Sequence, residues 1–141
     1  MVGISVSAEA AFAALVAIWF VVGWWRQMAE ERQGAIAALL AATGALGINA
    51  LIGLLWYRPR PYVAHPGSVH LLVTHSADSS FPSDHAAAAF AIAVVLLIAH
   101  RRWGLLALAA AALTGYARVY VGDHYPTDVL AGRSWAAQRP W

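Results

Sequence analysis

The chain has 141 residues, which is room for about one domain, and 61% of them are hydrophobic while only 11% are charged. Roughly a quarter of the residues of an ordinary soluble protein are charged, so this composition argues against a water-soluble globule. The formal charge is +2 and all nine basic residues are arginines, scattered singly or in pairs, so we expect no nucleic-acid partner. The absence of cysteine excludes disulfides, thiolate metal sites and a cysteine nucleophile.

The apolar residues gather into runs that predict membrane helices. A bilayer core about 30 Å thick needs roughly 17 to 25 mostly apolar helical residues. Residues 10–25 and 33–57 carry no charged side chain and predict the first two spans. Residues 86–99 and 103–117 form shorter apolar runs, which become plausible spans when the residues at their ends are included. The sequence therefore predicts an all-helical, polytopic membrane bundle of about four spans.

Small residues inside these spans predict close packing between helices. They are Gly44, Gly47 and Gly53 in the second span, Ala89 and Ala93 in the third, and residues 109–112 in the fourth. Asn49 is interpreted as the donor or acceptor of an interhelical hydrogen bond rather than as a ligand. Trp56, Tyr57, Tyr62 and Trp103 are interpreted as anchors at the membrane interface.

The second and third spans are separated by a long loop, residues 58–82, in which Pro59, Pro61, Pro66 and Pro82 are expected to break any helix. Four alternating spans place this loop on the same side as the region after Val121. The turns near residues 26–32 and 100–102 then lie on the other side. Their arginines put them in the cytoplasm by the positive-inside rule, so the loop is expected to face outward.

The shared outer side carries the residues that are suited to phosphate chemistry. Arg60 lies in an extended, proline-stiffened segment, and its guanidinium can grip an anionic oxygen through two hydrogen bonds. Ser83 follows a proline and is a natural N-cap of the third span, where a helix N-terminus favours an anion. His85 projects from the first turn of that helix, within reach of the same anion for proton exchange.

The end of the fourth span supplies the other half of the predicted site. Arg118 needs an anionic partner or a polar cavity at this depth. His124 and Asp128 flank Pro126, which suits the first turn of a new helix. In such a turn the carboxylate can accept from one imidazole nitrogen and leave the other with a free lone pair, as a directed nucleophile requires. Two arginines, a helix-terminal serine and two histidines suit phosphoryl transfer through a phosphohistidine, without a metal or a cofactor.

Three short motifs resemble the signature motifs of the type 2 phosphatidic acid phosphatase superfamily: Arg60-Pro61, Pro82-Ser83-Asp84-His85 and Arg118-x5-His124-x3-Asp128. The sequence Arg-Pro-Arg-Pro at residues 58–61, with Asp84 where most members have glycine, resembles the bacterial undecaprenyl pyrophosphate phosphatases associated with bacitracin resistance. The resemblance covers the chain from about the second span to Gly132.

The resemblance implies a role for each matching residue. His124 would be the nucleophile, Asp128 its orienting partner and His85 the general acid for the leaving group. The phosphate would be bound by Arg60, Ser83 and Arg118, with Asp84 and Arg58 also in the substrate-binding set. The implied substrate is a lipid pyrophosphate, met by an active site at the outer face of a bacterial plasma membrane.

The chain departs from the family pattern in three places. Gly53 stands where the first motif usually begins with lysine, so one phosphate contact is expected to be either missing or supplied by Arg58, and Ala117 replaces a usual serine. Family members continue after the third motif into another membrane helix. Here residues 1–132 are interpreted as the phosphatase domain and residues 133–141 as an atypical polar tail, produced by truncation or by a change of reading frame after Gly132. Loss of that helix would leave one side of Asp128 unsupported.

Several alternatives stay open from the sequence. The enzyme could be a broader phosphatidate or phosphatidylglycerophosphate phosphatase, and a protein without the final helix could be an inactive membrane protein. His65, His70 and His75 recur at every fifth position and suggest a metal site or a transporter. Asp78 and Asp123 are interpreted as solvated loop charges, although a purely structural pairing of Arg118 with Asp123 is an alternative. The partners predicted are the lipid substrate and membrane lipids, and the sequence sets no oligomeric state.

Overall fold

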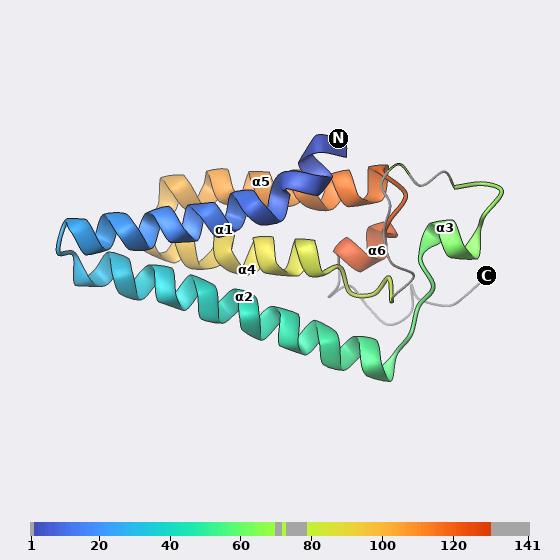
Figure 1. Cartoon of the computed structure of the whole chain (residues 1–141), viewed down its shortest axis with the longest axis horizontal. Helices are drawn as coiled ribbons and strands as arrows, with labels where there is room; N and C mark the ends of the chain where they lie inside the picture. The colour runs from blue at the N-terminus through green and yellow to red at the C-terminus, as the bar shows by residue number, and fades with distance from the viewer. Residues whose placement is uncertain (1, 70–71, 73–78, 131–141) are drawn as a thin grey trace.

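The structure is a computed structural model that describes residues 2–69, 72 and 79–130, and it confirms the all-helical prediction. No strand occurs in these residues. The helices are α1 (Val2–Trp25), α2 (Ala29–Leu55), α3 (Pro61–Ala64), α4 (Asp84–Ala99), α5 (Arg101–Tyr120) and α6 (Pro126–Val129). The four long helices lie side by side, and the two short ones, α3 and α6, lie at one end of the bundle (Figure 1).

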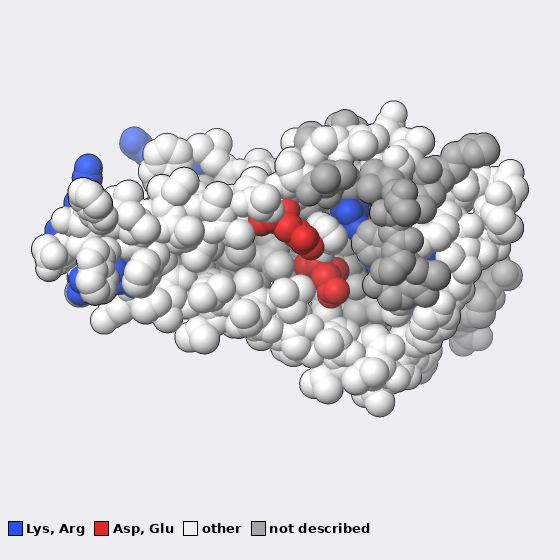
Figure 2. All heavy atoms as spheres, viewed as in Figure 1, with Lys and Arg blue, Asp and Glu red and all other residues white. Residues whose placement is uncertain are grey.

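The two tight turns of the bundle meet at its other end, as the sequence predicts. The α1–α2 turn passes through Gln27, whose φ is 58°, and the α4–α5 turn passes through His100. The Nε2 atom of His100 lies 2.7 Å from Oε2 of Glu31, which also accepts a 2.6 Å hydrogen bond from the Trp19 indole. The arginines near these turns project from this end of the bundle (Figure 2), so it is the more basic end on the face shown.

Two of the described helices are long and apolar enough to cross a membrane, namely α1 over residues 7–25 and all of α2. At 1.5 Å per residue α4 is only about 24 Å long and α5 about 30 Å. Large apolar side chains are exposed along the bundle, as Leu55 (87%) and Ile98 (82%) illustrate. Two helices extend beyond the apolar runs that predicted them. The prediction ended each run at a polar residue, but Glu9 lies inside α1 and Arg118 lies inside α5.

The helices pack through small side chains, but the glycine prediction is wrong. Ala89, Ala93 and Ala111 are buried, as expected from the alanine faces of α4 and α5. Among the described residues nothing lies within 4 Å of a β-carbon built at Gly44 or Gly47, and Gly53 would meet only Ser79, at 3.9 Å. These glycines face away from the neighbouring described helices.

Close helix approach occurs at other glycines, Gly104 and Gly115. A β-carbon at Gly104 would lie 2.0 Å from Cα of Leu97, inside the α4–α5 hairpin. A β-carbon at Gly115 would lie 2.4 Å from Cγ1 of Val129, where α6 packs on α5. Gly115 therefore sets how closely the short helix after His124 can approach the bundle.

The long loop contains one helical turn, so the prediction that its prolines break any helix is wrong. Pro61 occupies the first position of α3, where its missing N–H is not needed and its fixed φ suits the helix. Arg60, just before it, is extended as predicted, with φ −66° and ψ 154°. The predictions for His70, His75, Asp78 and residues 133–141 lie outside the described residues.

Candidate functional site

His124 lies in the turn between α5 and α6, and its imidazole is held in one orientation. The residue is 3% exposed. Its Nδ1 atom lies 2.8 Å from the carbonyl oxygen of Ser80, and because a carbonyl only accepts, Nδ1 must carry the proton. Nε2 is then left with a lone pair, and Nη1 of Arg60 lies 3.2 Å from it. This is the tautomer that a histidine nucleophile needs.

Asp128 supports this imidazole indirectly. Its Oδ2 atom lies 3.7 Å from Nδ1 of His124, which is too long for the hydrogen bond that the sequence led us to expect. The carboxylate instead accepts from the Ser80 hydroxyl, from the Tyr125 backbone N–H at 2.8 Å and from Arg58 at 2.6 Å. Asp128 thus fixes Ser80, and the Ser80 carbonyl fixes His124. Sequence reasoning missed Ser80, one of two adjacent loop serines, because it belongs to none of the three motifs.

Asp123 joins the two arginines of the predicted site, so its interpretation as a solvated loop charge is wrong. The residue is 1% exposed. Its Oδ1 accepts from Nη1 of Arg60 at 2.6 Å, and its Oδ2 accepts from Arg118. Its Oδ2 also lies 3.5 Å from Nε2 of His124. Two buried guanidiniums and Nε2 of His124 therefore surround one carboxylate, and burial of this aspartate is feasible because both cations neutralise it.

Ser83 brings a polar group to this cluster from the start of α4. It is the N-cap residue, as predicted, but its side chain makes no capping hydrogen bond. Its backbone N–H donates to the Asp128 carbonyl at 3.2 Å, which ties α4 to α6. Its buried hydroxyl has no hydrogen-bond partner among the described residues. Leaving a buried hydroxyl without a partner costs about 1–3 kcal/mol, so this group is suited to bind a ligand oxygen.

His85 lies in the first turn of α4, as predicted, and borders the same cluster. Its Nε2 atom lies 2.9 Å from Oε1 of Glu9 on α1. The imidazole also interacts electrostatically with Arg118, His124 and Asp123, so both predicted histidines belong to one charged neighbourhood.

Asp84, the residue before His85, is tied to α2. Its Oδ1 atom accepts a 2.9 Å hydrogen bond from the amide of Asn49, which confirms the interhelical hydrogen bond predicted for that residue. The first turn of α4 is therefore held from α2 by Asp84 and from α1 by His85.

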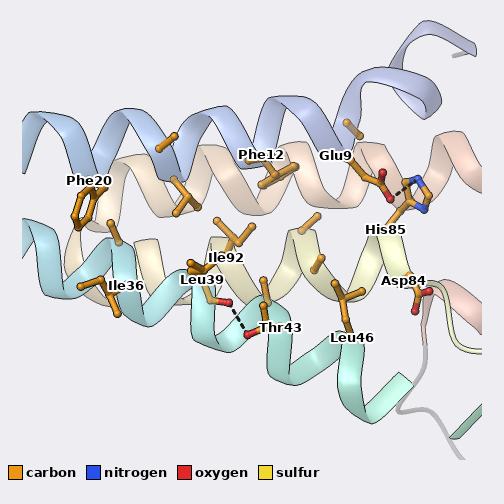
Figure 3. A pocket seen from close by; sticks show the side chains of 18 residues that line it. Glu9, Phe12, Phe20, Ile36, Leu39, Thr43, Leu46, Asp84, His85 and Ile92 are labelled. Carbon is orange, nitrogen blue, oxygen red and sulfur yellow. Dashed lines mark hydrogen bonds and ion pairs between the residues drawn. The ribbon is translucent and has the colours of Figure 1, made fainter. Parts of the chain in front are cut away.

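An apolar groove runs from this polar cluster along the bundle. Its volume is about 810 Å³, and it lies between α1, α2 and α4 (Figure 3). Phe12, Leu39 and Ile92 line its length, while Glu9 and His85 stand at one end. An apolar groove with charged side chains at one end suits an amphiphilic ligand.

The donor set of the cluster suits an anion. Arg60, Arg118 and the Ser83 hydroxyl can all donate to phosphate oxygens. Within the described part of the chain, no three histidine, aspartate or glutamate side chains are grouped so that they could hold a metal ion. His65 is exposed at the end of α3.

The fold and this cluster define an integral membrane protein in which arginines and a histidine surround a buried carboxylate. The sequence profile of the PAP2 superfamily matches residues 34–137, and the chain belongs to that superfamily.

Three comparisons place the chain within the superfamily. It is 41% identical to undecaprenyl-diphosphatase BcrC of Bacillus subtilis (strain 168) over 82% of this chain and 56% of that protein. It is 34% identical to the bacitracin transport permease protein BcrC of Bacillus licheniformis over 83% of this chain and 57% of that protein. The crystal structure of a transmembrane PAP2-type phosphatidylglycerolphosphate phosphatase from Bacillus subtilis matches with a TM-score of 0.72 and 26% identity, over 94% of this chain and 67% of that one. The chain thus spans a little more than half the length of these two relatives.

Proposed function

We propose that the protein is a membrane hydrolase that converts undecaprenyl pyrophosphate to undecaprenyl phosphate through a phosphohistidine at His124, without a metal ion or cofactor. The observation that carries this proposal is the orientation of His124. Its Nδ1 is held by the Ser80 carbonyl at 2.8 Å, and its Nε2 lies among the guanidiniums that would bind the phosphate. The similarity to undecaprenyl-diphosphatase BcrC of Bacillus subtilis supports this substrate.

The proposed reaction has two steps. The Nε2 lone pair of His124 attacks the terminal phosphorus, the bond to the bridging oxygen breaks, and that oxygen takes a proton from His85. Water then attacks the phosphohistidine, the P–N bond breaks, and His85 takes the proton of the water. The products are the lipid monophosphate and inorganic phosphate, and both histidines return to their starting forms.

Phosphate binding exchanges one anion for another at the arginines. Arg60 and Arg118, now bound to Asp123, would transfer hydrogen bonds to the phosphate, and Ser83 would donate its hydroxyl. Arg58 is 22% exposed and already braces Asp128, so it can reach a second phosphate oxygen without leaving the site. The Asp84 carboxylate can only accept hydrogen bonds, so it would not bind the phosphate directly. It would contribute to the site by accepting from Asn49, which holds the first turn of α4.

The apolar groove is the proposed path of the lipid chain. Ala13 lines the groove, whereas Ala14 is exposed outside it. Ala13→Phe should therefore raise KM for the long-chain lipid about fivefold and leave hydrolysis of a short, water-soluble phosphate ester unchanged. Ala14→Phe is the matched control, and an equal effect of both variants would contradict this path.

The central experiment measures phosphate release from undecaprenyl pyrophosphate by the purified full chain in detergent with EDTA. His124→Ala should lower kcat at least a thousandfold, because the nucleophile is lost. The control is His100→Ala, which removes a histidine that also pairs with a carboxylate but lies at the other end of the bundle. Equal kcat for His124→Ala and the unchanged protein would refute the mechanism.

The same assay separates the alternatives. Faster release from phosphatidate or phosphatidylglycerophosphate than from undecaprenyl pyrophosphate would favour the broader phosphatase, as the name of the structural neighbour suggests. No release from any of these lipids would favour an inactive membrane protein. Activity lost on chelation and dependent on His65 would favour the metal-site alternative.

We also propose a bacterial plasma-membrane location with the site facing outward. Arg26, Arg32, Arg101 and Arg102 lie at the end with the two turns, while Arg58 and Arg60 at the other end are paired with carboxylates. The chain has no cysteine, so single cysteines report sidedness directly. In intact spheroplasts, Ser68→Cys should react with a membrane-impermeant maleimide and Gln27→Cys should not. The reverse pattern would overturn this orientation.

A further inference from the structure

Glu9 on α1 is the one acidic side chain that contacts His85 directly in the described structure, and the proposed mechanism gives it no role. Its Oε1 atom lies 2.9 Å from Nε2 of His85. The two side chains point toward each other at the polar end of the groove (Figure 3). The side chain of Glu9 is 66% exposed, while that of His85 is 16% exposed, so the carboxylate is the more accessible partner of the pair.

The described contact of Glu9 within the fold is with the first turn of α4. Glu9 lies in the first half of a helix that is longer than its apolar span, and the described structure gives it one ion pair, with His85. It also lies outside residues 34–137, the part of the chain that matches the superfamily profile. A charged side chain kept at the edge of a membrane span is expensive unless it is used or hydrated.

The charged groups around His85 act in opposite directions on its protonation. Burial, Arg118 on α5 and His124 in the α5–α6 turn act against a proton on the His85 imidazole, whereas Glu9 and Asp123 act in its favour. Asp123 is already neutralised by two arginines, as described above. Asp84, its neighbour on α4, is engaged by Asn49. Glu9 is therefore the counter-charge that is free to stabilise an imidazolium at His85.

We propose that Glu9 is a positioning residue for the proton donor: it holds Nε2 of His85 and keeps the imidazolium charged, so that Nδ1 gives its proton to the leaving oxygen. When the P–O bond breaks, the Nδ1 proton moves to that oxygen, and the neutral imidazole stays hydrogen bonded to Glu9 through Nε2–H. This inference rests on the proposed function, because it assigns a partner to the proposed acid.

The first test is the pH profile of lipid pyrophosphate hydrolysis by Glu9→Gln. The amide keeps a polar contact but removes the charge, so His85 should lose its proton at lower pH. The alkaline limb of kcat should move down by about half to one pH unit, with kcat at pH 8 about fivefold lower, little change at pH 5.5 and KM within twofold. Glu30→Gln, which removes an exposed glutamate near the α1–α2 turn, should leave the profile unchanged.

Two further variants exclude a merely structural role. Glu9→Asp should restore part of the alkaline activity, and Glu9→Gln added to His85→Ala should cause no loss beyond that of His85→Ala alone, since the two act as a unit. A Glu9→Gln profile that superimposes on that of the unchanged protein would overturn the proposal, as would an equal loss at every pH with raised KM.

The second test does not need turnover. NMR titration of histidine rings labelled with ¹⁵N, with the His85 signal assigned by its absence in His85→Gln, should show His85 losing its proton at lower pH in Glu9→Gln. An unchanged titration would overturn the role of Glu9 whatever the activity. A shifted titration in a protein that releases no phosphate would support the Glu9–His85 pair and refute the proposed function, so the two failures are distinguishable.

Discussion

The two ends of the bundle both place a carboxylate among donors, but they use it differently. At the end with the two turns, Glu31 accepts from the Trp19 indole and contacts His100, and these bonds join α1, α2 and the α4–α5 turn. At the other end, Asp123 holds Arg60 and Arg118 beside Nε2 of His124, and the Ser83 hydroxyl has no partner among the described residues. In the first cluster, the carboxylate has a structural role. In the second, the proposed function requires a phosphate to take the place of the Asp123 carboxylate at the arginines.

The largest difference between the two ends is expected when a guanidinium is removed from the second cluster. Arg60→Ala should lower kcat about a thousandfold, because charge that develops on the phosphate loses a buried donor. Arg60→Lys should also be poor, since an ammonium cannot reproduce two-point binding. Arg101→Ala, at the opposite end, should keep kcat within twofold in the same phosphate-release assay. A kcat of Arg60→Ala within tenfold of the unchanged protein would contradict the assignment.

A second test changes the packing of α6 on α5, next to the second cluster, and leaves the charged side chains of the cluster in place. Gly115→Ala places a methyl group 2.4 Å from Val129 and should push α6 away from α5, with kcat falling about thirtyfold. Gly44→Ala, with no described atom within 4 Å, should have no effect on kcat. Adding Val129→Ala to Gly115→Ala should recover most of the activity. If the double variant is no better than Gly115→Ala, displacement of α6 is not the cause.

The exchange of anions at the arginines can be measured directly. Asp123→Asn removes the internal competitor, so inorganic phosphate should inhibit about tenfold more tightly. The same change should lower the free energy of unfolding by about 3 kcal/mol, because two buried guanidiniums lose their neutralising charge. The inhibition constant of phosphate and thermal unfolding in detergent test both effects, with Glu30→Gln as a charge-matched control. An unchanged or weaker inhibition constant would show that Asp123 does not compete for the arginines.

The smallest effect is expected at the structural end. Glu31→Gln should lower the free energy of unfolding by about 1 kcal/mol, because the bonds with Trp19 and His100 lose their ionic acceptor. The value of kcat should stay within twofold of the unchanged protein. A thermal unfolding scan and the phosphate-release assay check this pair of outcomes, and a large drop in kcat would mean that the two ends are coupled.

Hydropathy predicted the bundle well because membrane helices depend on long apolar runs. Residues 33–57 predict α2 almost to its ends, and the shared side of the two turns follows from alternation alone. The helix ends were less predictable. The helix α1 includes Glu9 and the helix α5 includes Arg118, because each side chain has an ionic partner. Hydropathy gives no information on such partners.

The site was predicted where spacing along one helix carries the information. Ser83 and His85 at the start of α4, and Pro126 and Asp128 in α6, have the local positions that their motifs predicted. The rest depends on contacts between distant segments. Ser80 reaches His124 across 44 residues, and Asp123 is buried only because Arg60 and Arg118 converge on it. Local sequence patterns do not predict such contacts between distant segments.

The unequal lengths of neighbouring helices have a consequence for the surrounding lipid. The 27 residues of α2 extend about 40 Å, whereas the 16 residues of α4 beside it extend only about 24 Å, and α4 begins at the histidine-bearing turn. A hydrocarbon layer about 30 Å thick does not match so short a segment, so the bilayer must thin or admit water beside it. The proposed substrate, undecaprenyl pyrophosphate, would then present its diphosphate to the protein below the level of the bulk headgroups, without leaving the leaflet that solubilises its chain.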